Sequence, residues 1–337
     1  MNDNFVRKFI EFVKKIIGIG NALVDVLARI SSDKVLSDLN LPKGSTQFTS
    51  TEQQKEVERT LASLDTTASA GGSASNAMKA ASMLGMETAF IGKTGDDKMG
   101  AAFKAALEEH QVKPFLITMQ GYPTGIASTF ITPDGQRTFA DNLGASALLS
   151  HTDFSADLLD SYDTLYVEGY LVQNHDLIST VLRWAKEKDM TTCLDLASYN
   201  VVSSERSFFS QLIEQYVDIV FANEEESMAL TGLSAEASAR EMEKICKIAV
   251  VKMGSRGACA YTQGKIYSAP GVHVSNVTDT TGAGDSFSGG FLYAYSKGKD
   301  IASCLQTGNT VAAEMIQHIG ATLSKDIWQD IKRGLQF

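Results

Sequence analysis

Short apolar runs alternate with helical patterns along most of this chain, and this alternation constrains the fold more than any other feature. The runs are apolar on both faces, as in strands buried on both sides of a sheet. Buried strands separated by helices predict a central, mostly parallel sheet with helices on both faces. The predicted strands are residues 16–20, 88–92, 164–168, 192–196, 219–222 and 248–253, and the predicted helices include 74–84, 99–109, 178–188 and 235–246.

Two regions depart from this rhythm. Residues 22–50 contain an apolar run at 23–30 and then LPKGSTQF, which reads as extended chain. Residues 124–143 read as a hairpin, because GIASTFIT and QRTFADNL flank the turn Pro133-Asp134-Gly135. We therefore expect a single α/β domain over residues 14–330, with 22–50 and 124–143 as insertions that form a small β lid.

Composition excludes several classes of function. A net charge of −10 argues against a nucleic-acid surface, which needs clustered Lys and Arg. The four cysteines are far apart in sequence, which predicts reduced thiols rather than a zinc site and a cytoplasmic protein. No run of 18 apolar residues is present, so no membrane span is expected. Residues 5–17 read as a short helix or a longer first strand, and residues 1–13 are assigned no role.

The segment Asp279-Thr280-Thr281-Gly282-Ala283-Gly284-Asp285 has the strongest chemical character. Its glycines form a loop, and a helical pattern follows. Backbone amides at such a helix start can hold a phosphate and the charge that develops when it is transferred. The carboxylate of Asp285 can accept a proton from a substrate hydroxyl. An ordinary N-capped helix after a glycine turn is the alternative interpretation.

A second glycine-rich segment runs from Ala70 to Asn76, with the sequence AGGSASN, and opens a predicted helix. Its paired glycines allow a ligand to approach the backbone, and Asn76 can bond hydroxyl groups. Other phosphate-binding patterns fit poorly. No GxxxxGK[ST] loop occurs, the dinucleotide pattern that begins at Gly18 has Leu23 at its third glycine position, and the five histidines are scattered.

These segments resemble the motifs of one family, the ribokinase-like kinases of the phosphofructokinase-B type. DTTGAGD followed by SFSGGF resembles its C-terminal motif, and GGSASN its N-terminal motif. Residues 223–226 resemble its N-x-x-E motif and residues 252–257 its K-x-G-x-x-G loop, and the match runs from about residue 16 to 324. The resemblance implies a three-layer α/β/α domain with a β lid. It also implies ATP-dependent phosphoryl transfer to an alcohol of a small sugar or nucleoside.

The resemblance also implies roles for individual residues. Asp285 is similar to the catalytic base, and the residues that supply its anion-hole amides are Gly282, Ala283 and Gly284. The residues implied to bind the acceptor are Asn21, Asp25, Gly71, Gly72, Ser73 and Asn76. Those placed beside ATP are Asn223, Lys252, Gly254, Gly257, Thr281 and Asn309.

Two metal sites follow from the same resemblance. Asn223 and Glu226 look like the pair that holds Mg²⁺ through water, although residues 224–226 also read as a solvated acidic helix start. The residues that match positions binding K⁺ in some members are Asp279, Thr281, Gly320 and Ser324. Some members pair through their lids, so a monomer and a lid-mediated homodimer both stay open.

The acceptor is less constrained by the sequence. GN-x-L-x-D at residues 20–25, QRTFADNLGA and Gly320-Ala321-Thr322 look like the adenosine-kinase branch. The aromatic residues that would stack on a base, or lie in the core, are Tyr170, Phe130 and Phe139. Three interpretations stay open: a nucleoside kinase for adenosine, a kinase for fructose, ribose or a keto-deoxy sugar acid, and a non-catalytic nucleotide- or sugar-binding regulator.

Overall fold

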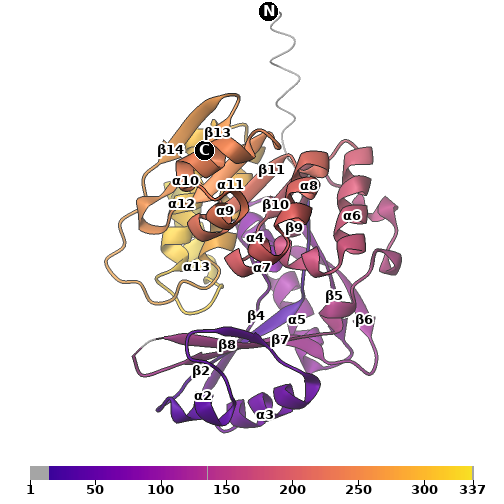
Figure 1. Cartoon of the computed structure of the whole chain (residues 1–337), viewed down its shortest axis with the longest axis vertical. Coiled ribbons are helices and arrows are strands. Elements are labelled where there is room, and N and C mark those ends of the chain that lie inside the picture. Colours follow the sequence, from indigo (N-terminus) through magenta and orange to yellow (C-terminus); the bar gives the residue numbers. More distant parts are fainter. Residues whose placement is uncertain (1–14, 135, 336–337) are drawn as a thin grey trace, which may run out of the picture.

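The computed structural model describes residues 15–134 and 136–335, and it contains two sheets (Figure 1). The larger sheet lies within the upper body in Figure 1, between helices. The smaller sheet lies below it and is reached by segments from the first half of the chain. The predicted ribokinase-like α/β fold with a mostly parallel central sheet is confirmed.

The large sheet has nine strands. They are β1 (Lys15–Ile19), β5 (Glu87–Gly95), β6 (Val112–Met119), β9 (Thr164–Glu168), β10 (Thr191–Asp195), β11 (Ile219–Asn223), β12 (Ile248–Lys252), β13 (Ala258–Thr262) and β14 (Lys265–Ala269). Their order is β14-β13-β12-β11-β10-β9-β1-β5-β6, and the strands from β12 to β6 pair in parallel. The β12–β13 and β13–β14 pairs are antiparallel.

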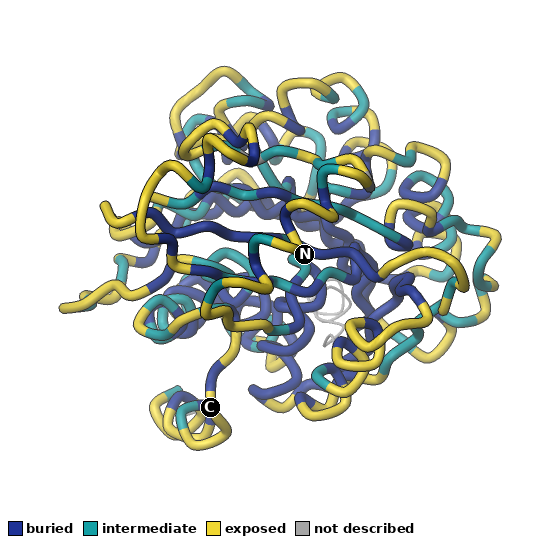
Figure 2. Tube along the Cα trace, turned by 90° about the horizontal axis from the view of Figure 1, so that it is seen from below, coloured by how far each residue is buried: buried dark blue, intermediate teal, exposed yellow. Residues whose placement is uncertain are grey.

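Helices cover both faces of this sheet because successive residues of each strand point to opposite sides. Ile16 and Ile17, for example, belong to two different apolar clusters. The helices on one side are α4 (Ser73–Leu84), α5 (Lys98–Glu109), α11 (Ala283–Ser296) and α12 (Ile301–Met315); those on the other are α6 (His175–Glu187), α7 (Tyr199–Ser204), α8 (Arg206–Tyr216), α9 (Glu224–Thr231) and α10 (Ala235–Met242). Figure 2 shows the resulting arrangement, with buried strands inside and exposed helix faces outside.

Two predicted helices differ from the structure by more than one residue at an end. Helix α6 begins at His175, because the Asn174 side chain caps it by accepting from the Leu177 N–H (3.0 Å). Helix α10 ends at Met242 rather than residue 246, and the chain turns there into β12. A further helix, α13 (Lys325–Gly334), packs Trp328 and Ile331 against α4.

The small sheet has five strands in the order β3-β8-β7-β2-β4. They are β2 (Leu23–Arg29), β3 (Thr46–Phe48), β4 (Thr66–Ala70), β7 (Thr124–Ile131) and β8 (Arg137–Gly144). Strands β7 and β8 pair antiparallel, which confirms the predicted hairpin. One face of the sheet packs against helices α2 (Lys34–Asp38) and α3 (Thr51–Leu61), and the other faces the large domain.

The predicted lid differs from this sheet in two ways. LPKGSTQF, residues 41–48, was expected to be extended, but only three of its residues form β3, and helix α2 precedes it within 22–50. The sheet also includes β4, with α3 before it, beyond the expected limit at residue 50. Strand β4 carries a mostly exposed TTASA sequence with little apolar character, so no periodicity marks it as a strand.

Three smaller observations complete the fold. Of the four cysteines, Cys193, Cys259 and Cys304 are buried, and all are free thiols. Within residues 15–134 and 136–335, no helix is long and apolar enough to cross a membrane. The expectations for residues 1–13, and for most of 5–17, lie outside the described residues.

Candidate active site

Polar side chains gather where the central parallel strands end. Asn21 follows β1, Glu168 ends β9, Asp195 ends β10, Asn223 ends β11 and Lys252 ends β12. The carboxyl ends of neighbouring parallel strands lie at one edge of a sheet, which is where α/β proteins bind ligands. Here that edge faces the small sheet across a cavity of about 660 Å³ lined by residues of both.

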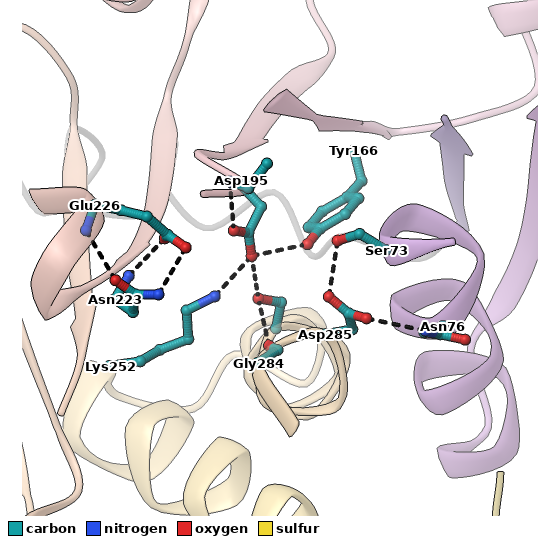
Figure 3. Close-up of polar contacts among 11 residues, drawn as sticks. Ser73, Asn76, Tyr166, Asp195, Asn223, Glu226, Lys252, Gly284 and Asp285 are labelled. Carbon is teal, nitrogen blue, oxygen red and sulfur yellow. Dashed lines mark hydrogen bonds and ion pairs between the residues drawn. The ribbon is translucent and has the colours of Figure 1, made fainter. Parts of the chain in front are cut away.

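Asp285 lies in this cavity between the starts of two helices (Figure 3). It belongs to the first turn of α11, and Ser73 and Asn76 belong to the first turn of α4. Ser73 Oγ donates to Asp285 Oδ1 (2.7 Å), and Asn76 Nδ2 donates to Asp285 Oδ2 (3.0 Å). Both motifs found in the sequence therefore meet at one carboxylate.

The electrostatics of Asp285 suit a proton acceptor. Burial raises the pKa of Asp285 above the usual carboxyl value, and the hydrogen bond from Asn76 opposes that rise. Asp195 raises this pKa further, whereas Ser73 and Lys252 lower it. A carboxylate with a raised pKa is a stronger proton acceptor than an ordinary one, which suits a general base.

The loop before Asp285 has the shape that its glycines permit. Gly282 has φ +72°, in the left-handed region that favours glycine, and it precedes the first residue of α11. The first N–H groups of a helix lack partners within the helix, and here Ala283 and Gly284 line the cavity. In this conformation the Ala283 N–H donates to the Thr280 carbonyl (3.3 Å).

Asp195 organises the centre of the site and was missed by the sequence analysis. Its Oδ2 is 2.8 Å from Lys252 Nζ and accepts from Tyr166 Oη (3.2 Å) and Ser288 Oγ (3.1 Å) (Figure 3). Ser288 Oγ also donates to the carbonyl of Gly284, in the glycine loop beside Asp285 (3.1 Å). Asp195 thus holds Lys252 next to that loop.

Glu168 is the second carboxylate that was missed. Its Oε1 accepts from the N–H and Nδ2 of Asn21 (both 2.8 Å), and its Oε2 accepts from the Ala74 N–H at the start of α4 (2.9 Å). Burial raises the pKa of Glu168 to about 7, and the two backbone N–H groups oppose that rise. The side-chain amide of Asn21, which was predicted to bind the acceptor, therefore donates to Glu168 in this structure. A side chain at Gly20 would overlap the same carboxylate.

Asn223 and Glu226 form a closed pair at the start of α9. Glu226 accepts from the N–H and Nδ2 of Asn223 (both 2.7 Å), and Asn223 Oδ1 accepts from the Glu226 N–H (2.8 Å). Burial raises the pKa of Glu226, and Lys252 opposes that rise. Since both carboxylate oxygens already accept hydrogen bonds, the pair fits a magnesium ion held through water better than one held directly.

Asp279 and Ser324, two of the residues expected to bind K⁺, have protein partners in this structure. The carboxylate of Asp279 accepts from the N–H groups of Thr281 (2.7 Å) and Gly320 (2.9 Å). It also pairs with Arg137 from β8, whose guanidinium donates to Thr281 Oγ1 (2.8 Å). Ser324 instead caps α13 by accepting from the Ile327 N–H.

The residues expected beside ATP include two glycines after β12 and one asparagine on α12. Gly254 and Gly257 bound a short 3-10 helix after β12 and have φ values of +57° and +92°. Asn309 on α12 donates to the carbonyls of Ala269 (3.2 Å) and Pro270 (3.1 Å), so its amide holds the loop after β14.

The small sheet supplies the opposite wall of the cavity. Asp25 on β2 lies against Gly71, where any side chain would overlap its carboxylate. Phe139 and Tyr170 line the cavity. Phe130 does not, because it belongs to the face of β7 that packs on α2 and α3 and is fully buried.

Most of the predicted site residues line this one cavity. The exceptions are Gly71, Asp279, Gly320 and Ser324, which are not among its lining residues. Glu168 and Asp195 could have been found in the sequence, since each is a carboxylate within or at the end of a predicted buried strand.

A family model for pfkB carbohydrate kinases matches residues 44–328. The chain belongs to the pfkB family of carbohydrate kinases. This pfkB kinase is 32% identical to an uncharacterized sugar kinase of Archaeoglobus fulgidus over 244 residues, 71% of this chain and 95% of the relative. It is 28% identical to 5-dehydro-2-deoxygluconokinase of Bacillus thuringiensis over 264 residues, 73% of this chain and 79% of the relative.

The structure of this pfkB kinase is similar to that of adenosine kinase from Sinorhizobium meliloti. The TM-score is 0.87 at 28% identity, over 95% of this chain and 99% of that one. The predicted family and enzyme class, a phosphotransferase acting on an alcohol group, are confirmed. The pfkB kinase is therefore a sugar or nucleoside kinase.

Proposed function

We propose that this pfkB kinase transfers the γ-phosphate of ATP to a hydroxyl group of a nucleoside of the adenosine type. One observation carries the choice of a nucleoside. The acceptor end of the cavity joins the carboxylate of Asp25 to an apolar wall of Leu23, Phe48, Phe139 and Leu143. A carboxylate can accept two adjacent ribose hydroxyls, and an apolar wall suits the flat faces of a base.

The transfer then uses the residues around Asp285. Asp285 takes the proton of the acceptor hydroxyl, the hydroxyl oxygen bonds to the γ-phosphorus, and the bond from that phosphorus to the bridging oxygen breaks to release ADP. Ser73 and Asn76 orient the Asp285 carboxylate. The N–H groups after Gly282 and the ammonium of Lys252 stabilise charge on the phosphoryl group. Magnesium, held through water by Asn223 and Glu226, would neutralise the ATP phosphates.

The test is ATP consumption by the full chain with adenosine, ribose, fructose and a keto-deoxy sugar acid, each with magnesium. We expect the highest kcat/KM with adenosine. A higher kcat/KM with fructose or ribose would contradict the nucleoside assignment and leave the kinase chemistry in place. ATP binding without transfer to any of these acceptors would favour a non-catalytic regulator.

A further inference from the structure

A row of side chains crosses the small sheet on the face that lines the cavity. In the strand registers, Asp25 on β2 lies opposite Ala127 on β7, Ala127 lies opposite Asp141 on β8, and Asp141 lies opposite Phe48 on β3. Directly opposed residues share one face of a sheet. All four of these residues line the cavity.

The spacing of this row places two carboxylates at a distance that one small molecule can span. Asp25 and Asp141 are two strands apart, and each strand step is about 4.8 Å, so their backbones are about 10 Å apart. The side chain of Ala127 between them is small, so it leaves space in the cavity between the two carboxylates. The neighbouring rows add apolar side chains, with Leu23 and Leu143 on one side and Phe139 on the other.

Asp141 has a buried oxygen, Oδ1, that no described residue satisfies with a hydrogen bond. Burial raises the pKa of Asp141 to about 7, and the charge of Asp25 adds to that rise. Burial likewise raises the pKa of Asp25, opposed by the charge of Lys79. A buried acceptor that no protein group satisfies requires an explanation, and a ligand that donates hydrogen bonds provides one.

The cationic side chains near the cavity lie away from Asp25 and Asp141. Of the described residues that line the cavity, only Lys252 is cationic, and it pairs with Asp195 at the phosphate end. Lys79 on α4 is 3% exposed, donates to the Ala70 carbonyl and is not among the lining residues. Arg137 is occupied by Asp279 and Thr281. An acceptor that carried a carboxylate would therefore meet Asp25 and Asp141 without a counter-charge.

We propose that Asp141 is a specificity-determining residue that, together with Asp25, selects an uncharged or cationic acceptor with hydrogen-bond donors at both ends and rejects sugar acids. This inference rests on the proposed kinase activity and refines its substrate class. The Asp25 carboxylate accepts hydrogen bonds from hydroxyl groups near the reacting oxygen. The Asp141 carboxylate accepts a hydrogen bond from an amino or hydroxyl group at the far end of the same molecule.

The experiment compares neutral acceptors (adenosine, ribose and fructose) with acids (5-dehydro-2-deoxygluconate and 2-keto-3-deoxygluconate) in the full chain at pH 8, above the pKa of Asp141, which is raised to about 7. We expect wild type to use the best neutral acceptor with a kcat/KM about 100-fold or more above that of either acid, since a like charge opposite a buried carboxylate strongly disfavours binding. The acids should also fail to inhibit the reaction of the neutral acceptor.

Two variants assign this selection to Asp141. Asp141→Asn removes the charge and keeps the shape, so acids should gain about tenfold or more in kcat/KM. Asp141→Ala removes the hydrogen-bond acceptor, so the KM of the neutral acceptor should rise about tenfold with little change in kcat. As a control, Asp38→Asn makes the same charge change at an exposed position of helix α2, which packs against the small sheet. It should alter neither the kcat/KM of the acids nor the KM of the neutral acceptor.

The outcomes separate this inference from the proposed function. Wild type that uses acids as well as neutral acceptors, or selection that is unchanged in Asp141→Asn, would overturn the role of Asp141 while the kinase activity stands. Both variants should unfold at or above the wild-type temperature at pH 8, because each removes a buried charge. Failure of wild type to phosphorylate any acceptor would overturn the proposed function and this inference with it.

Discussion

The guanidinium of Arg137, on strand β8 of the small sheet, lies 2.5 Å from the carboxylate of Asp279 in the loop that leads to Asp285 (Nη2 to Oδ1). The same guanidinium donates to Thr281 Oγ1. The Asp279 side chain is 2% exposed and that of Arg137 is 20% exposed, so water screens this pair weakly. The small sheet is thus tied by a charge pair to the loop that leads to Asp285.

Loss of this pair should destabilise the protein in a pH-dependent way. Burial alone would raise the pKa of Asp279, but hydrogen bonds from Gly320 and Thr281 and the charge of Arg137 hold it below its usual value. The stabilisation is therefore present above pH 4 and is lost as the pH falls through the lowered pKa. Arg137→Met should cost about 1–3 kcal/mol at pH 7 in urea unfolding, and this cost should shrink as the pH falls below the ordinary carboxyl pKa.

A double-mutant cycle separates this pair from general effects of the substitution. With Asp279→Asn as the second change, the double variant should be more stable than the sum of the single changes predicts. Strict additivity at pH 7 would show that Arg137 and Asp279 do not stabilise one another in solution.

Asp25 should act on the acceptor and leave ATP binding unchanged. Asp25→Ala should raise the KM of the acceptor and lower kcat, because a misplaced hydroxyl no longer lies in line with the γ-phosphate. The affinity for ATP measured without acceptor should hardly change. A selective loss of ATP affinity in this variant would contradict the substrate role of Asp25.

The small sheet should close over the acceptor as one unit. Strands β2, β7 and β8 are paired along most of their length, so we expect them to move together. Addition of adenosine should slow hydrogen exchange in residues 23–29 and 124–144 to a similar extent. The distant strand β14 serves as an internal control and should not respond. If exchange in the small sheet is insensitive to every accepted substrate, it is not a lid.

Glu226 should act on magnesium indirectly. Glu226→Gln keeps the shape but weakens the reciprocal bonds with Asn223, so the magnesium concentration for half-maximal activity should rise severalfold without loss of activity at saturation. Glu225→Gln changes a neighbouring exposed carboxylate of the same helix and should leave the titration unchanged. Identical titrations for the two variants would contradict the assignment of Glu226.

The parallel part of the fold could be predicted from sequence because its strands are buried on both faces. Strands such as β9 and β11 are continuous apolar runs with a clear signal. Strands β14 and β4 are short and mostly exposed, so tertiary pairing rather than local periodicity makes them strands. Strand β6 contains Pro114, which weakens a strand signal.

The site also combines residues that have a local sequence signal with contacts that depend on the folded sheet. Asp285, Ser73 and Asn76 stand in recognisable motifs, although 209 residues separate Asn76 from Asp285 in sequence. The link between Asp25 and Asp141 depends on the register of three strands from distant segments, including a parallel pairing of β2 with β7. That register is a property of the folded sheet and has no sign in the local sequence.

The central claim is that Asp285 acts as the base. A comparison of the pH–rate profiles of wild type and of the Asp285→Asn variant tests it most directly. Asn keeps the shape of the side chain but cannot take a proton, so kcat should fall about 10²–10⁴-fold while ATP affinity is nearly unchanged. Because burial raises the pKa of Asp285, wild-type kcat should rise with pH through a range above the usual carboxyl value as Asp285 ionises. Asp285→Asn should lose that rise together with turnover, and an Asn variant with wild-type kcat would contradict the account.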